Sequence, residues 1–83
     1  MKLSPTAQEQ FSDSIQLIFG VDISNQLSEI DRQGHLETIE AARIKIMQIL
    51  FEAGIRTTPD ERVRLTNIFE SHGITSKHSR RAR

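Results

Sequence analysis

The sequence predicts an all-α fold, a small bundle of three main helices over about residues 5–19, 35–53 and 59–72. Apolar residues recur at intervals of three and four, and no long segment alternates between apolar and polar residues as strands do. Prolines and glycines stand where helices begin and end. A short helix at 23–33 is also predicted, and the length of 83 residues allows one hydrophobic core.

Both prolines mark predicted helix starts. Pro5 follows Ser4, which fits an N-cap residue with proline at the first helical position. Thr58 precedes Pro59 and stands three residues before Glu61, the spacing of a capping box. We therefore expect reciprocal hydrogen bonds between Thr58 and Glu61.

Three of the four glycines predict helix ends, because glycine adopts the left-handed conformation without a steric penalty. Each of the three is followed by a β-branched apolar residue: Gly20-Val21, Gly54-Ile55 and Gly73-Ile74. That residue is expected to fold back and contact a side chain five or six positions earlier.

The fourth glycine, Gly34, separates the short helix from the helix at 35–53. Asp22 or Ser24 is expected to cap the start of the short helix. The apolar stripes on the two sides of Gly34 do not align as one face, which favours a bend over one long helix.

The helix at 35–53 is apolar around most of its circumference. Between residues 41 and 53 the polar side chains are Arg43, Lys45, Gln48 and Glu52. Such a helix is expected at the centre of a small core, or with part of its surface paired with a second copy or another protein. The predicted partner-binding residues are Ile44, Met47 and Phe51.

The net charge of zero hides an asymmetry. Residues 1–40 carry two basic and seven acidic groups, whereas residues 41–83 carry nine basic and four acidic groups. This division can orient a charged partner, or it can be neutralised within the fold or across a dimer.

The composition argues against several classes of function. The chain has no cysteine, which excludes disulfide scaffolds and thiolate metal sites. It has no segment typical of a signal peptide or membrane span, so we expect a soluble, cytoplasmic protein. We expect no enzyme activity, cofactor, metal site or small-molecule substrate.

The titratable residues support that expectation. A helix continuing through Gly34 would place Asp31 and His35 one turn apart, as half a metal site or, more simply, an exposed helix-end ion pair. His72 suits the negative end of its helix dipole. Glu37 and Glu40, one helical turn apart, are interpreted as solvated surface rather than a catalytic pair.

Residues 75–83 form a basic tail outside the helical domain of residues 1–74, and the tail is expected to be flexible. The permanent positive charges of the tail are Lys77, Arg80, Arg81 and Arg83. They can contact nucleic acid or an acidic protein surface, together with Arg62 and Arg64. Asp60 and Glu61 disfavour a DNA-reading helix at 59–72, because they bring negative charge to its N-terminal end.

These observations predict a small non-enzymatic interaction protein, an adaptor, chaperone or regulator, that binds a protein partner through an apolar helix face and acts as a homodimer. The alternative is a nucleic-acid-associated transcriptional regulator that uses the basic tail with Arg62 and Arg64.

The alternative is tested by titrating the chain against random duplex DNA at increasing salt in a filter-binding assay. A nucleic-acid binder shows a steep salt dependence, which weakens when the chain is truncated after Thr75 because fewer phosphates are neutralised. Absence of binding at low salt would contradict the alternative.

Overall fold

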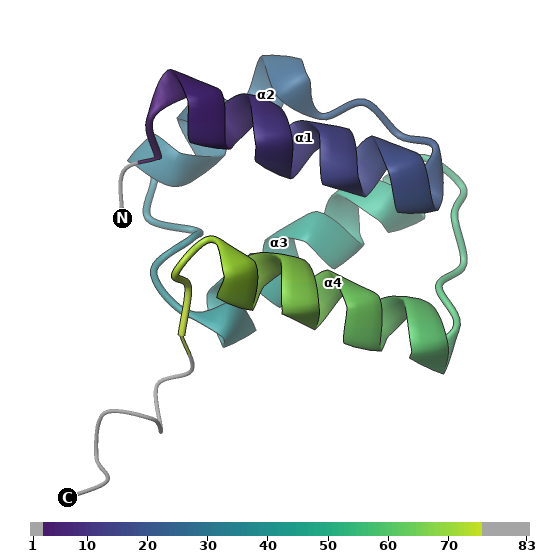
Figure 1. Cartoon of the computed structure of the whole chain (residues 1–83). Coiled ribbons are helices and arrows are strands. Elements are labelled where there is room, and N and C mark those ends of the chain that lie inside the picture. The colour runs from purple at the N-terminus through teal and green to yellow at the C-terminus, as the bar shows by residue number, and fades with distance from the viewer. Residues whose placement is uncertain (1–2, 76–83) are drawn as a thin grey trace, which may run out of the picture.

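Four helices make up the computed structural model, which describes residues 3–75 (Figure 1). The helices are α1 (Pro5–Phe19), α2 (Ser24–Arg32), α3 (Ile39–Glu52) and α4 (Pro59–Ser71). No strand occurs within the described span. α1 and α4 run in opposite directions side by side, and α3 crosses behind them. The all-α fold and the short helix are therefore confirmed.

The predicted capping hydrogen bonds are present at the starts of α1 and α4, and each joins residues three positions apart. The Ser4 hydroxyl accepts the Ala7 N–H at 3.1 Å. Thr58 Oγ1 accepts the Glu61 N–H at 3.1 Å, and Glu61 Oε1 accepts the Thr58 N–H at 2.9 Å, which confirms the capping box. These bonds satisfy backbone donors that the first turn of a helix leaves without partners.

At α2 the capping differs from both predicted forms, because Ile23 occupies the N-cap position and makes no side-chain cap bond. Asp22 Oδ1 instead accepts the Ser24 N–H at 2.9 Å. Hydrogen bonds from the Ser24 side chain and backbone hold the pKa of the exposed Asp22 carboxyl below its ordinary value.

The predicted glycine ends are confirmed at the backbone. The Ile55 N–H donates to the Leu50 carbonyl at 2.9 Å, and the Ile74 N–H donates to the Phe69 carbonyl at 3.0 Å. These bonds, which span five residues, are those of the Schellman motif. α1 ends with a simpler bond, from the Gly20 N–H to the Gln16 carbonyl at 2.8 Å.

The predicted start of the third helix at residue 35 is wrong by four residues. Gly34 has a φ of 86°, and the His35 N–H donates to the Ile30 carbonyl at 3.1 Å, so α2 ends in a fourth glycine cap. The chain bends there, as expected, and α3 begins only after Thr38, whose side chain accepts the Ala41 N–H at 3.1 Å.

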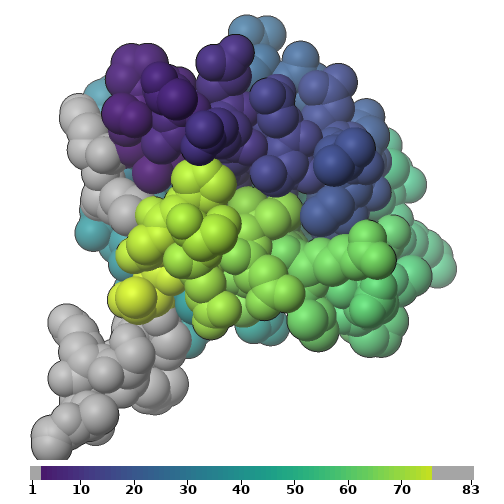
Figure 2. Space-filling model, viewed as in Figure 1, coloured from purple at the N-terminus to yellow at the C-terminus, as the bar shows by residue number. Residues whose placement is uncertain are grey.

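Every helix contributes to a single apolar core. Across α1 and α4 the rings of Phe11 and Phe69 stack with centroids 5.8 Å apart. The His72 ring meets Phe11 edge-on at 5.3 Å, and its Nδ1 lies 3.1 Å from the Ile68 carbonyl. Figure 2 shows α1 and α4 meeting along a continuous seam. Aromatic contacts of this kind add to the free energy gained by burial.

Both ends of the described chain are tied to this core. The buried Leu3 donates its N–H to Asp31 Oδ2 at 2.5 Å, and its carbonyl accepts from Gln8 Nε2 at 3.1 Å. Asp31 is 4% exposed, so the expected exposed pair with His35 is wrong. At the other end, the Thr75 carbonyl accepts the Ile39 N–H at 2.9 Å.

Replacing Asp31 with alanine is expected to lower the free energy of unfolding by about 1–3 kcal/mol, because the buried Leu3 N–H loses its acceptor. Asp31→Asn keeps an acceptor oxygen and is expected to lose less. Asp13→Ala, at an exposed position of α1, is the matched control. Denaturant unfolding measures all three, and equal losses for Asp31→Ala and Asp13→Ala would contradict the role of Asp31.

Candidate functional site

The outer face of α3, defined here by the stripe from Ala41 to Phe51 that points away from the core, carries exposed apolar side chains. Ile44 is 72% exposed and Phe51 is 77% exposed. Seven residues make about two turns, so both lie on the same side of the helix. The core side of α3 holds Ala42, Ile46 and Leu50, all fully buried.

Other exposed apolar side chains do not form such a pair. Leu17 on α1 and Val63 on α4 are also large, apolar and exposed, but each stands on a separate helix. Isolated apolar residues are ordinary on protein surfaces, whereas exposed apolar side chains on one helix face are a candidate contact surface. The outer face of α3 is therefore the strongest candidate site.

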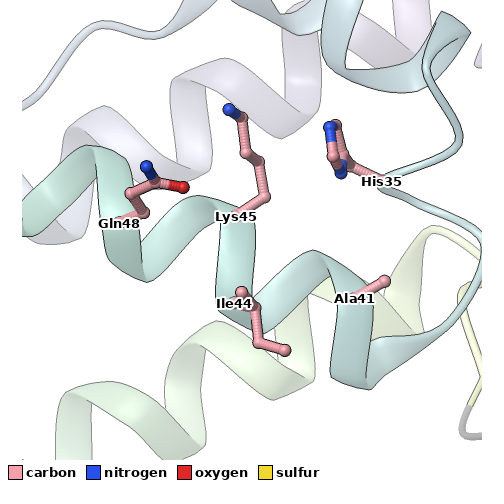
Figure 3. A pocket seen from close by; sticks show the side chains of 5 residues that line it. All are labelled: His35, Ala41, Ile44, Lys45 and Gln48. Carbon is pink, nitrogen blue, oxygen red and sulfur yellow. The ribbon is translucent and has the colours of Figure 1, made fainter.

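Two shallow hollows flank Ile44. The larger has a volume of about 260 Å³ and is lined on α3 by Ala41, Ile44, Lys45 and Gln48, with His35 at its edge (Figure 3). The smaller, of about 210 Å³, is lined by Glu40, Arg43 and Ile44.

The α3 residues that line the larger hollow have the spacing of a packing site for a second helix. Its α3 residues stand at positions i, i+3, i+4 and i+7, the four corners of the hole that accepts one side chain of a facing helix. Its volume is below the range of about 300–1,000 Å³ typical of small-molecule pockets. The hollow therefore suits a protein side chain better than a small ligand.

Met47, the third predicted partner-binding residue, lies at the border between the core and the outer face. It is half-buried and packs against the core. Its sulfur accepts a weak hydrogen bond from the Thr57 hydroxyl at 3.8 Å. Met47 thus packs beside the outer face and adds little exposed apolar surface to it.

The predicted nucleic-acid contacts on α4 already have local partners. Arg62 Nη1 donates to the Thr57 carbonyl at 2.9 Å and to the Thr57 hydroxyl at 3.2 Å, which fastens the α3–α4 connection to α4. Arg64 forms an exposed ion pair with Asp60 at 3.4 Å. The tail residues lie outside the described residues: Lys77, Arg80, Arg81 and Arg83.

The titratable residues singled out in the sequence are dispersed. His35 Nε2 lies 3.2 Å from Gln33 Oε1. Glu37 precedes α3 rather than lying within it, so the expected placement of Glu37 and Glu40 on one helical turn is wrong. Between residues 3 and 75, no cluster of three or more histidine and carboxylate side chains could hold a metal ion, and no helix has the length and apolarity to cross a membrane.

Comparison of the chain with models of known families, with curated proteins and with solved structures finds no match. The geometry of α3 is therefore what indicates a function for this chain. Ala41, Lys45 and Gln48 line the site but were not predicted as contact residues. Their spacing was visible in the sequence, whereas the side of α3 that stays open was not.

The outer face is expected to be dispensable for folding. Ile44→Gln and Phe51→Gln should each change the free energy of unfolding by no more than about 0.5 kcal/mol, because the side chains are exposed. Ile46→Ala, two residues from Ile44 but on the core side of α3, should cost about 2–5 kcal/mol. Denaturant unfolding provides the comparison, and a loss at Ile44 as large as that at Ile46 would place Ile44 within the folding core.

Proposed function

We propose that this protein is a non-enzymatic interaction protein, an adaptor, chaperone or regulator, that binds an amphipathic helix of a protein partner on the outer face of α3. One observation carries the proposal: Ile44 and Phe51 are exposed on one helix face, and the hollow beside Ile44 has the spacing of a helix-packing hole.

Helix-in-groove recognition explains how such a face works. The partner helix covers Ile44 and Phe51 and inserts one of its apolar side chains beside Ile44. Complete burial of a large apolar side chain contributes about 1.5–3 kcal/mol, so these two residues supply the central part of the binding energy. The mechanism is then occlusion or bridging of the partner, without covalent chemistry.

Charged groups at the rim select the orientation of the partner. Arg43 and Lys45 stand on opposite flanks of the apolar stripe, and Glu52 lies two turns beyond Lys45 on the same flank. A partner helix with complementary charges beside its apolar face is favoured over one with like charges. The nucleic-acid alternative stays a prediction, because its tail residues lie outside the described residues.

Site-specific photo-crosslinking in the cell that produces the protein tests the proposal. A benzophenone amino acid replaces Gln48, which lines the larger hollow without belonging to the apolar pair. We expect a discrete protein adduct, either with another protein or with a second copy. The adduct should disappear when Ile44→Glu is added, because a carboxylate cannot be buried in the contact without a partner.

The matched control places the same amino acid at Gln10, an exposed position on α1. An equal adduct from Gln10, or an adduct at position 48 that survives Ile44→Glu, would overturn the proposal. Absence of any adduct at position 48 would do the same. Normal unfolding of the Ile44→Glu variant shows that a lost adduct does not reflect misfolding.

A further inference from the structure

We propose that the helix that fills the outer face of α3 is α3 of a second copy of the chain, packed antiparallel across a two-fold axis near Gln48. This inference rests on the proposed function, because it uses the same face, and it commits to one partner. It follows from the arrangement of two pairs of residues on α3, one apolar and one charged.

The apolar pair is self-complementary. Ile44 and Phe51 stand seven residues apart on one face, with their midpoint between Met47 and Gln48. A two-fold axis at this point, perpendicular to α3, reverses the direction of the second helix and places the partner's Phe51 beside Ile44. The same rotation places the partner's Ile44 beside Phe51, so both exposed side chains are covered at once.

The hollows beside Ile44 provide space for the partner's Phe51. Ile44 rises between them, and each is open to the outside of α3. The partner's Phe51 ring arrives at the level of Ile44, where the hollows leave room for an inserted side chain. Gln48 lies close to the axis, so the two Gln48 amides approach each other and can exchange hydrogen bonds.

The charged pair repeats the same geometry on the flank. Lys45 and Glu52 also stand seven residues apart, one position beyond the apolar pair, with their midpoint between Gln48 and Ile49. A two-fold axis of this kind matches each flank of α3 with the same flank of the second helix. Lys45 therefore meets the partner's Glu52. The midpoint of the charged pair lies one residue from the midpoint of the apolar pair, so one two-fold axis serves both pairs.

Antiparallel packing has a further electrostatic advantage, since it aligns the positive end of each helix dipole with the negative end of the other. A parallel dimer would turn the Lys45 flank toward the opposite flank of the second helix and lose the Lys45–Glu52 pair. Because Lys45 and the partner's Glu52 meet only when the helices are antiparallel, this charge pair favours the antiparallel dimer over the parallel one.

The expected dimer is weak. α3 has 14 residues and is about 21 Å long, so helix-to-helix contact alone lies at the lower end of stable interface sizes. We therefore expect a dissociation constant in the micromolar range, and a dimer that a competing helix can open.

Sedimentation equilibrium of the full chain up to about 1 mM tests self-association. The wild type should form a dimer, and Ile44→Glu should abolish it. Lys45→Glu should weaken it about tenfold, because attraction becomes repulsion at two symmetric positions. The double variant Lys45→Glu/Glu52→Lys should restore the dimer, whereas Arg56→Glu, an exposed charge outside α3, should leave it unchanged.

Engineered cysteines test the direction of the helices, because the chain contains no cysteine of its own. Under mild oxidation Gln48→Cys should link to itself. Ile44→Cys mixed with Phe51→Cys should give a mixed disulfide, since these positions face each other. Self-linking of Ile44→Cys and of Phe51→Cys in separate samples would instead show a parallel dimer. Leu17→Cys, exposed on α1, is the control.

The outcomes separate this inference from the proposed function. A wild type that stays monomeric at about 1 mM overturns the dimer. If the Gln48 photo-adduct with a different protein persists in that case, the proposed function stands. A dimer that survives Ile44→Glu overturns the proposed arrangement. Failure of the double charge reversal to restore the dimer overturns the antiparallel register.

Discussion

The burial of α3 is the constraint on which the rest of this structure depends. Its core side must be covered completely, and Ala42, Ile46 and Leu50 are fully buried. Only three other helices are available within the described residues, and α1 is itself engaged with α2 and α4. A helix that is apolar around most of its circumference cannot be surrounded by so few neighbours. One side of α3 therefore remains open, and this is the side that carries Ile44 and Phe51.

Contacts away from α3 hold it in a defined position. Phe11 and Phe69 join α1 to α4, and Arg62 fastens the connection that leads from α3 into α4. The carbonyl of Thr75 satisfies the Ile39 N–H at the first residue of α3. Because these contacts already order α3, the binding proposed for its outer face would order little additional backbone of this chain. Preorganisation of this kind lowers the entropic cost of association.

The charge asymmetry between the two halves of the sequence has a limited role in the fold. The Glu29–Arg32 and Asp60–Arg64 ion pairs each lie within one helix, three or four residues apart. Surface pairs of this kind contribute little free energy and do not join the acidic half to the basic half. In the proposed complex, the charges that matter for recognition are those on the flanks of α3, where their spacing rather than the net charge of the chain decides which helix can pack against it.

The sequence alone was sufficient for the features that depend on neighbouring residues. The helix starts at Ser4 and Thr58 and the ends at Gly20 and Gly54 follow from hydrogen bonds within a few positions, so they could be predicted from spacing. The cap at Gly34 was missed because His35 follows it in place of a β-branched apolar residue. At this cap the apolar residue buried in the core is Leu36, which stands two positions after Gly34.

Only the tertiary structure decided the features that join distant residues. Asp31 and Leu3 stand 28 positions apart, and no local pattern shows that their hydrogen bond removes Asp31 from the surface. The sequence likewise predicted that α3 was too apolar to be exposed all round, and it suggested Ile44, Met47 and Phe51 as contacts. Which side of α3 stays open depends on how α1 and α4 pack, and that packing drew Met47 toward the core while leaving Ile44 and Phe51 outside.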